Sequence, residues 1–314
     1  MRKGRMLLAL GVLLAAGAAD ARGTSSLSGA ARCRLPPGWD QVAARGARFV
    51  VFGEMHGTQQ SPRFFGDVAC ALAARGERLL VAVEHFSTVN GDFQKAWALP
   101  DADFVPALTK AGWAGRDDGV GSEAMLAMLV RLHRLARAGY RIDIVAFSGV
   151  RDEAQQRRFA SLAGQGPHDA AQAENIREAA VRRPYDHVLI LVGNAHARKS
   201  PVTYTPVPFE PMAMQLGKSE SVVSLNMKSA AGTIWNCGLK PDVVRKPGVP
   251  ITNADIACGA HPATADADLK PTPFIALGGL PGQQPDPDYD GVYWLGPISA
   301  SPPAVPDRSP PRNP

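Results

Sequence analysis

The sequence predicts an α/β fold in which a mainly parallel central sheet is flanked by helices on both faces. Its strand-like segments are near-continuous apolar runs with little alternation, which is typical of strands that are buried on both faces. Helical segments separate these runs and carry apolar residues at three- and four-residue spacing. Crossovers between parallel strands are almost always right-handed, so we expect the carboxyl ends of the strands to share one edge of the sheet.

The individual elements follow from the same pattern. We expect strands at residues 48–54, 78–85, 140–148 and 187–197. We expect helices at residues 62–75, 122–139 and 169–183. The first helix begins with Pro62 and is followed by Gly76, and the second ends at Gly139, as helix boundaries often do.

The last third of the chain has a different composition. Residues 221–237 indicate two strands, with a turn at Ala231 and Gly232, that extend the sheet. Residues 260–288 are rich in Pro, Gly and Asp, which favours loops.

The domain boundaries follow from these differences. We expect one α/β domain over residues 46–300, with a short disulfide-tied C-terminal extension. Residues 301–314 form a Pro-rich tail that we expect to be disordered.

The amino-terminal 21 residues resemble a secretory signal. A basic start precedes the apolar run "MLLALGVLLAAGAA", and the small residues Ala19 and Ala21 mark a cleavage site. The run is too short to span a bilayer comfortably, and no cysteine follows it closely enough to accept a lipid. We therefore expect a signal peptide at residues 1–21, an N-terminal segment at residues 22–45, and an exported mature chain, periplasmic or secreted, without a transmembrane segment.

The charge of the chain argues against nucleic acid as a partner. The formal net charge is +5, and removing the signal removes three positive charges and one negative charge, which leaves about +3. Lys and Arg are scattered among apolar residues and form no stripe.

The four cysteines are candidates for disulfides because an oxidising compartment favours them. Cys237 and Cys258 bracket a short loop, while Cys70 lies on the first helix, where an N-terminal segment carrying Cys33 could cross it. We favour the pairs Cys33–Cys70 and Cys237–Cys258, although the sequence alone leaves three connectivities open.

Polar side chains follow the carboxyl ends of the predicted strands. They are Glu54, His56, Glu84, His85, Ser148, Arg151, Asp152, Asn194 and His196. In open α/β sheets, the ligand crevice lies outside the carboxyl ends of the strands. We therefore expect several of these groups to meet at one site.

The spacing of these residues indicates which of them face the crevice. Glu54 and His56, like Asn194 and His196, are two residues apart and point the same way in an extended chain. Glu84 and His85 are neighbours that face opposite sides; we place Glu84 in the crevice, with His85 in packing or in support of the site.

Two residues beyond the third strand have competing interpretations. Arg151 could bind an anion. Asp152 is better interpreted as a helix cap than as a site residue.

Carboxylate and imidazole groups can act as acids, bases or metal ligands, and they can activate water directly or through a divalent ion. Other chemistries lack their motifs. No Gly-x-Ser-x-Gly surrounds Ser148, His-Glu-x-x-His is absent, and "LGKS" at residues 216–219 lacks the first Gly of a phosphate-binding loop.

The order and spacing of four segments resemble those of a known superfamily. The segments are "VVFGEMHGTQQSP", "LLVAVEH", "QAENIREAA" and "VLILVGNAHA". The chain resembles the superfamily that joins ChaN-type haem-binding proteins, erythromycin esterases, TraB proteins and Tiki metalloproteases. The resemblance covers roughly residues 46–228, and "YDGVYWLGPIS" at residues 289–299 resembles a closing strand of the same domain.

The resemblance implies a site and a set of functions. It implies that Glu54, His56 and Glu84 form the core of the site, with His196 opposite them and Asn175 facing in from its helix. Tiki members are thought to use a metal at this site, whereas the esterases use Glu and His to activate water. The chain lacks the lipidation cysteine of ChaN-like proteins and shows no added Tyr or His for iron.

Our leading hypothesis is an exported hydrolase that acts on a small-molecule or peptide substrate. The predicted catalytic residues, which are also the ligands if a divalent metal ion is present, are Glu54, His56, Glu84 and His196. In this hypothesis Glu54 and His56 activate water, and Glu84 and His196 position the ion or the substrate. The predicted substrate-binding residues are Asn194, Arg151, Asn175 and His85. The alternatives are a haem- or iron-binding uptake protein without catalysis and a non-catalytic module.

Overall fold

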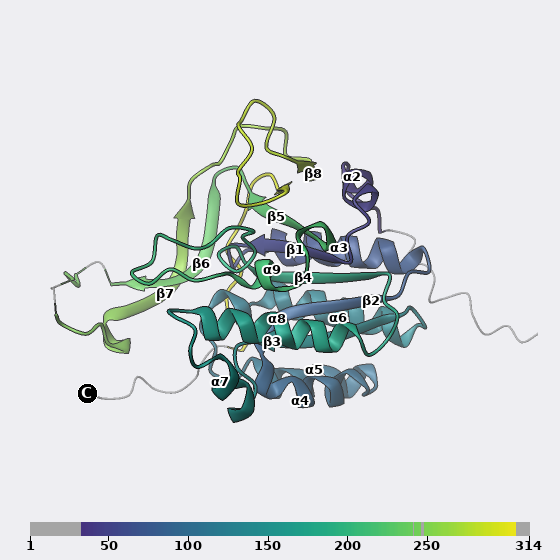
Figure 1. The fold of residues 1–314 in the computed structure, drawn as a ribbon, viewed down its shortest axis with the longest axis horizontal. Helices are drawn as coiled ribbons and strands as arrows, with labels where there is room; N and C mark the ends of the chain where they lie inside the picture. The colour runs from purple at the N-terminus through teal and green to yellow at the C-terminus, as the bar shows by residue number, and fades with distance from the viewer. Residues whose placement is uncertain (1–32, 241, 246–247, 306–314) are drawn as a thin grey trace, which may run out of the picture.

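The computed structural model describes residues 33–240, 242–245 and 248–305 (Figure 1). The predicted signal peptide and residues 306–314 of the predicted tail lie outside the described residues. No helix within the described ranges is long and apolar enough to cross a bilayer.

The centre of the molecule is a seven-stranded sheet in the order β3-β2-β4-β1-β5-β9-β8. The strands are β1 (Phe49–Glu54), β2 (Leu79–Phe86), β3 (Ile142–Ser148), β4 (His187–Gly193), β5 (Val222–Lys228), β8 (Phe274–Leu277) and β9 (Gly291–Trp294). Every neighbouring pair is parallel except β8 and β9, which are antiparallel. The prediction of a mainly parallel sheet is confirmed.

Helices cover both faces of this sheet. One layer contains α2 (Trp39–Ala44), α3 (Gln60–Ala74), α4 (Asn90–Trp97), α5 (Asp101–Gly112) and α6 (Glu123–Arg137). The other contains α8 (Gly166–Ala180) and α9 (Met212–Gln215), with α7 (Glu153–Phe159) packed against α8. Alternate residues of β1 enter opposite cores: Val50 and Phe52 pack under the first layer, and Phe49 and Val51 under the second. This alternation explains why the strands are apolar throughout.

Short 3-10 helices connect several of these elements. They span Ser87–Val89, Gly119–Gly121, Ser219–Ser221 and Asn253–Asp255. The segment from 87 to 121, for which the sequence predicts no element, contains α4, α5 and two of these turns.

The C-terminal third corrects one part of the prediction. β5 extends the central sheet, as expected. The following strand, β6 (Gly232–Leu239), does not; it pairs antiparallel with β7 (Ile256–Ala263) in a separate two-stranded sheet. This sheet, which we call the β6–β7 arm, extends to one side of the molecule in Figure 1.

Both expected disulfides are present. Cys33 pairs with Cys70, which fastens the N-terminal segment to α3, and Cys237 pairs with Cys258 directly across the β6–β7 arm.

Residue 300 is not the end of the packed chain, because Ser301 is buried and its hydroxyl accepts a hydrogen bond from the Ala124 backbone N–H at 2.9 Å.

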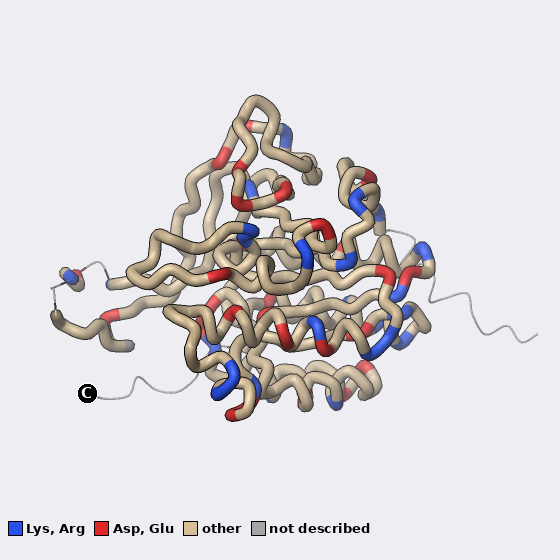
Figure 2. The backbone as a smooth tube through the Cα atoms, viewed as in Figure 1, with Lys and Arg blue, Asp and Glu red and all other residues tan. Residues whose placement is uncertain are grey.

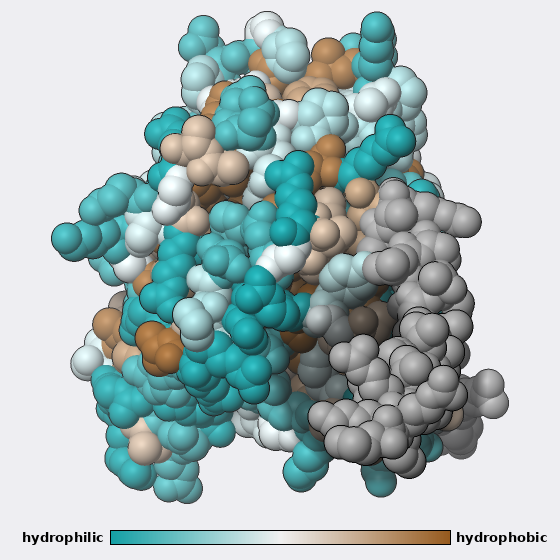
Figure 3. Space-filling model, turned by 90° about the vertical axis from the view of Figure 1, so that its right-hand side faces the viewer, coloured by the Kyte–Doolittle hydropathy of each residue, from teal (hydrophilic) through white to brown (hydrophobic). Residues whose placement is uncertain are grey.

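Figure 2 shows Lys and Arg interspersed with Asp and Glu over the described backbone. Figure 3 shows the side of the molecule that lies on the right in Figure 1, where polar groups predominate and apolar ones are scattered.

Candidate functional site

The carboxyl ends of β2, β4 and β1 meet at one edge of the sheet because these strands are neighbours and run in parallel. Glu54 is the last residue of β1, and Glu84 lies near the end of β2. β4 lies between them and ends at Gly193, where a Cβ atom would come within 3.0 Å of His56 Nε2. The glycine therefore leaves room for His56 to reach across the end of β4 toward Glu84.

His56 is held between two carboxylates. Its Nδ1 lies 2.9 Å from Glu54 Oε1, and its Nε2 lies 3.1 Å from Glu84 Oε2. A carboxylate can only accept at these positions, so both ring nitrogens carry protons. Burial opposes the charged ring, but the two carboxylates outweigh it and raise the pKa of His56 to about 10. His56 is therefore an imidazolium at neutral pH.

Glu84 connects this pair to a second histidine. Its Oε2 also accepts a hydrogen bond from the Gly193 backbone N–H at 2.7 Å, and its Oε1 lies 3.6 Å from His196 Nε2. Burial disfavours the carboxylate, but the His56 and His196 charges and these hydrogen bonds hold its pKa far below the usual value. Glu84 is thus an anion that joins two imidazoles.

His196 is supported from behind by a buried carboxylate. Its Nδ1 lies 2.8 Å from Oδ1 of Asp169, which also accepts a hydrogen bond from the Met212 backbone N–H at 2.8 Å. Burial opposes the charge of His196, but the hydrogen bond to Asp169 and the charge of Glu84 raise its pKa. Because Asp169 fixes the proton on Nδ1, Nε2 points at the site with its lone pair available in the neutral ring.

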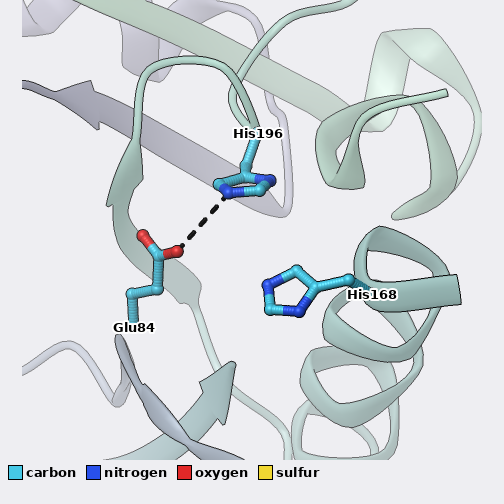
Figure 4. A group of neighbouring side chains, drawn as sticks. All are labelled: Glu84, His168 and His196. Carbon is cyan, nitrogen blue, oxygen red and sulfur yellow. Dashed lines mark ion pairs between the residues drawn. The ribbon is translucent and has the colours of Figure 1, made fainter. Parts of the chain in front are cut away.

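A third histidine faces the same point from α8. Figure 4 shows His196 and Glu84 turned toward each other, with His168 opposite them. Gln172, one turn later, lies 2.9 Å from His168 Nε2 and 3.4 Å from Glu84 Oε1. Burial and the charge of His196 lower the pKa of His168, so this ring is neutral.

One set of ligand atoms in the site could hold a metal ion. One atom each of Glu84, His168 and His196 lies within 4.8 Å of the others. Two imidazoles and one carboxylate are a donor set that zinc accepts. Glu54 and His56, which the sequence includes among the metal ligands, are not in this set, because the carboxylates occupy both nitrogens of His56.

The four predicted catalytic residues come together, whereas the predicted substrate-binding residues mostly do not. His85 is fully buried on the other side of β2, with its ring 4.2 Å from that of Trp113 and 5.2 Å from that of Phe93. Its position supports the packing interpretation. Asn194 lies in the turn after β4, where its backbone N–H donates to the Glu54 carbonyl at 2.9 Å.

Asn175 and Arg151 form hydrogen bonds near the end of β3. The Asn175 amide donates to the carbonyls of Phe147 and Gly149 at 3.0 and 2.9 Å, and its oxygen accepts from Arg151 Nη1 at 3.1 Å. The polar atoms of Asn175 are thus used at this strand end, and its role in substrate binding stays a prediction. Arg151 is also paired with Glu178.

The neighbouring Asp152 caps a helix, as expected. Its side chain accepts a hydrogen bond from the Gln155 backbone N–H at 2.7 Å, at the start of α7.

Sequence reasoning missed His168, Asp169 and Gln172. It places the start of the helix at residue 169, but α8 begins at Gly166. The signal that could reveal them is the four-residue spacing of His168 and Gln172, which puts both on one face of a helix that starts with Pro at its second position.

The arrangement combines a fixed cation, a buried anion and an imidazole backed by aspartate. His56 offers positive charge, Glu84 links the two histidines, and His196 can accept and return a proton. Groups of these kinds can promote the addition of water to a carbonyl.

Comparison with known proteins bears on the fold of the chain alone. No protein-family model matches the chain, and no curated protein matches it. A mutant erythromycin esterase in its open conformation superposes with a TM-score of 0.57 at 12% identity, over 83% of this chain and 93% of the esterase.

Two further solved structures match nearly the whole chain. A succinoglycan biosynthesis protein has a TM-score of 0.53 at 9% identity and covers 91% of this chain and 100% of its own. A Bacillus cereus protein has a TM-score of 0.53 at 11% identity, and the match covers 90% of this chain and 100% of that protein. The chain thus shares the fold of these three proteins, one of which is an erythromycin esterase.

Proposed function

We propose that the protein is an exported hydrolase that cleaves a carbonyl compound, such as an ester, with an activated water molecule. The observation that carries this proposal is the continuous series Glu54–His56–Glu84–His196–Asp169 at the carboxyl edge of the sheet. Each histidine in it has a carboxylate behind it, and Glu84 lies between them. The fold shared with an erythromycin esterase agrees with this reaction class.

His196 is the general base in this proposal. The hydrogen bond to Asp169 fixes the ring and leaves Nε2 to take a proton from water. The water oxygen attacks the carbonyl carbon, and His196 then returns the proton to the leaving oxygen, giving an acid and an alcohol. His56, held as a cation, stabilises the negative charge that develops on the carbonyl oxygen.

This assignment differs from the sequence-based one, in which Glu54 and His56 activate water. The carboxylates on both sides of His56 keep it protonated, which suits it to charge stabilisation and makes it a poor base. Glu84 is too weak a base to replace His196, because its pKa is far below the usual value.

Kinetics of purified protein on a panel of small esters tests the proposal. We expect His196→Ala and Glu84→Gln each to lower kcat/KM by about 100-fold or more. The matched control is His187→Gln, because His187 lies at the opposite end of β4 from the site. Unchanged rates in the two site variants, or an equal loss in the control, would contradict the assignment. If Glu54→Ala and His56→Ala also change nothing, the non-catalytic alternative is preferred.

A metal-assisted version is the second candidate, because Glu84, His168 and His196 bring suitable ligand atoms together. A divalent ion held there would polarise the carbonyl and lower the pKa of water. Elemental analysis separates the two versions. Stoichiometric metal in the wild type that is lost in His168→Ala supports the metal-assisted version. Active protein that contains no metal supports the version in which His196 acts without an ion.

The uptake alternative makes a different prediction for the same protein. Haem binding in the crevice would produce a Soret band on titration with haem, and His56→Ala would abolish that band. Ester hydrolysis without a Soret band would exclude this alternative.

Export is the remaining part of the proposal. The two disulfides suit an oxidising compartment, and the sequence begins with a signal-like segment. Fractionation of cells that express the full chain provides the test. We expect periplasmic or secreted protein whose first residue lies near Arg22, and intact protein in the cytoplasm would contradict export.

A further inference from the structure

A cleft of about 700 Å³ lies between the β6–β7 arm and the loop at residues 115–118, and its walls adjoin Gly57, the residue after His56. Phe86, Arg116, Trp235 and the Cys237–Cys258 disulfide are among its lining residues. This volume falls within the range of about 300–1,000 Å³ that is typical of small-molecule sites. The cleft is therefore large enough for part of a small-molecule substrate.

Both walls of the cleft are packed onto the residue that follows His56. A Cβ atom on Gly57 would lie 2.0 Å from the Trp235 carbonyl oxygen, and one on Gly119 would lie 2.2 Å from the Gly57 nitrogen. The Trp235 backbone N–H donates to the Gly57 carbonyl at 2.9 Å. These close approaches connect the arm and the loop directly to the backbone that positions His56.

The two walls also contact each other. Trp235 Nε1 donates to the Asp117 carbonyl at 2.8 Å, which links the arm to the loop. The disulfide between Cys237 and Cys258 fixes the two strands of the arm together beside this contact. The two walls of the cleft are thus joined to each other.

Phe86 gives the cleft its chemical character. Its side chain is 52% exposed, although it follows Glu84 by only two residues, a span of about 7 Å at most. The Arg116 guanidinium lies 4.6 Å from the Phe86 ring centroid and is held by two hydrogen bonds to Asp118, at 3.1 and 2.7 Å. Since Arg116 covers part of the ring, the exposed remainder can pack against a ligand ring.

We propose that this cleft binds the apolar, ring-bearing part of the substrate, so that the enzyme prefers carbonyl compounds with an aromatic group over small aliphatic ones. The inference rests on the proposed hydrolase function and names the substrate class of that site. Arg116 pairs with Asp118, and Asp117 adds a second carboxylate to the lining, so the wall around Phe86 favours a ring without negative charge.

Two ethyl esters with the same leaving group provide the test. We expect kcat/KM for ethyl 3-phenylpropanoate to exceed that for ethyl acetate by about tenfold. Phe86→Ala should lower kcat/KM for the phenyl ester by about tenfold more than kcat/KM for ethyl acetate, so that the preference is lost, whereas Phe86→Tyr should retain it. Tyr204→Ala is the matched control, because Tyr204 is an exposed ring beside an arginine, Arg198, and lies outside the cleft lining.

The outcomes separate the cleft from the hydrolase function. If both esters are cleaved and Phe86→Ala affects both equally or neither, the cleft assignment is wrong while the hydrolase stands. If no ester is cleaved, binding of 4-phenyl-2-butanone and 2-butanone, measured by NMR, replaces the kinetic test. If the phenyl ketone binds more tightly and Phe86→Ala abolishes the difference, the cleft assignment is supported without the hydrolase function. Equal binding of the two ketones overturns the cleft assignment.

Discussion

His56 shows how two neighbouring carboxylates determine the state of one imidazole. Burial alone would favour the neutral ring, yet Glu54 and Glu84 contact both ring nitrogens. Each carboxylate would be a costly buried charge without the histidine, so the three groups stabilise one another. The charge state of each residue therefore depends on the other two.

The pH dependence of stability follows from this pairing. The folded-state pKa of His56 is raised from 6.5 to about 10, so its stabilising contribution is complete below pH 6.5 and is lost as the pH rises through about 10. We expect the free energy of unfolding of chelator-treated protein to fall across this interval. Glu84→Gln should lower it by about 3 kcal/mol at pH 7 and flatten the alkaline decline. Parallel curves for the two proteins would contradict the pairing.

Asp169 sets the pH dependence of catalysis through His196. A general base must be deprotonated, so kcat/KM should rise with pH through the raised pKa of His196. Asp169→Asn should move this rise to lower pH and reduce the plateau by about 100-fold, because the ring loses its orientation. A pH–rate profile of chelator-treated protein measures both effects. An unmoved profile would exclude His196 as the base.

At the scale of elements, short contacts between glycines connect the outer segments to the site. The 3-10 turn Gly119–Gly121 packs directly on the backbone of Gly57. A side chain at position 119 would have to displace that backbone. The turn therefore supports the position of His56.

Gly119→Ala tests this support. We expect a loss of about 1–3 kcal/mol in the free energy of unfolding from overpacking, together with a fall in kcat/KM as His56 shifts. Gly91→Ala is the control for loss of a glycine as such, because neither Gly91 nor Gly119 has a positive φ and an added Cβ on Gly91 would meet no atom within 4 Å. If Gly119→Ala behaves like this control, the contact is unimportant.

The Cys33–Cys70 disulfide fastens the N-terminal segment to α3, far from the catalytic groups. The two cysteines are 37 residues apart, for which chain entropy gives a stabilisation of about 4 kcal/mol. In the double variant Cys33→Ser, Cys70→Ser, the free energy of unfolding measured with denaturant should fall by most of this amount. The pH–rate profile should stay that of the wild type. A changed profile would show that the segment influences the site.

At the scale of the whole molecule, the parallel sheet determines which distant residues meet. The sequence predicts Glu54, His56, Glu84 and His196 because each follows a strongly apolar strand, and such strands are readily recognised. Their convergence then follows from strand direction alone. The order of the strands, which places β4 between β1 and β2, is visible only in the structure.

Other parts of the molecule carry weak or misleading sequence signals. α8 buries Asp169, Gln172 and Asn175 together with small apolar residues, so its pattern lacks a clear apolar stripe. α5 contains Pro106 in its interior, which conceals a helix.

The β6–β7 arm shows the same difficulty over a longer range. β6 pairs with β7 in a separate sheet, and β7 runs into a segment whose Gly and Pro content favours loops. Pairing between segments that distant cannot be inferred from local composition.

The most direct test of the central claim is an NMR titration of the His56 side-chain nitrogens in chelator-treated protein, with Glu84→Gln as comparison. Our account predicts that His56 in the wild type stays protonated up to about pH 10, and that Glu84→Gln lowers its pKa markedly. An ordinary pKa near 6.5 in both proteins would show that the carboxylates from β1 and β2 do not meet at this imidazole.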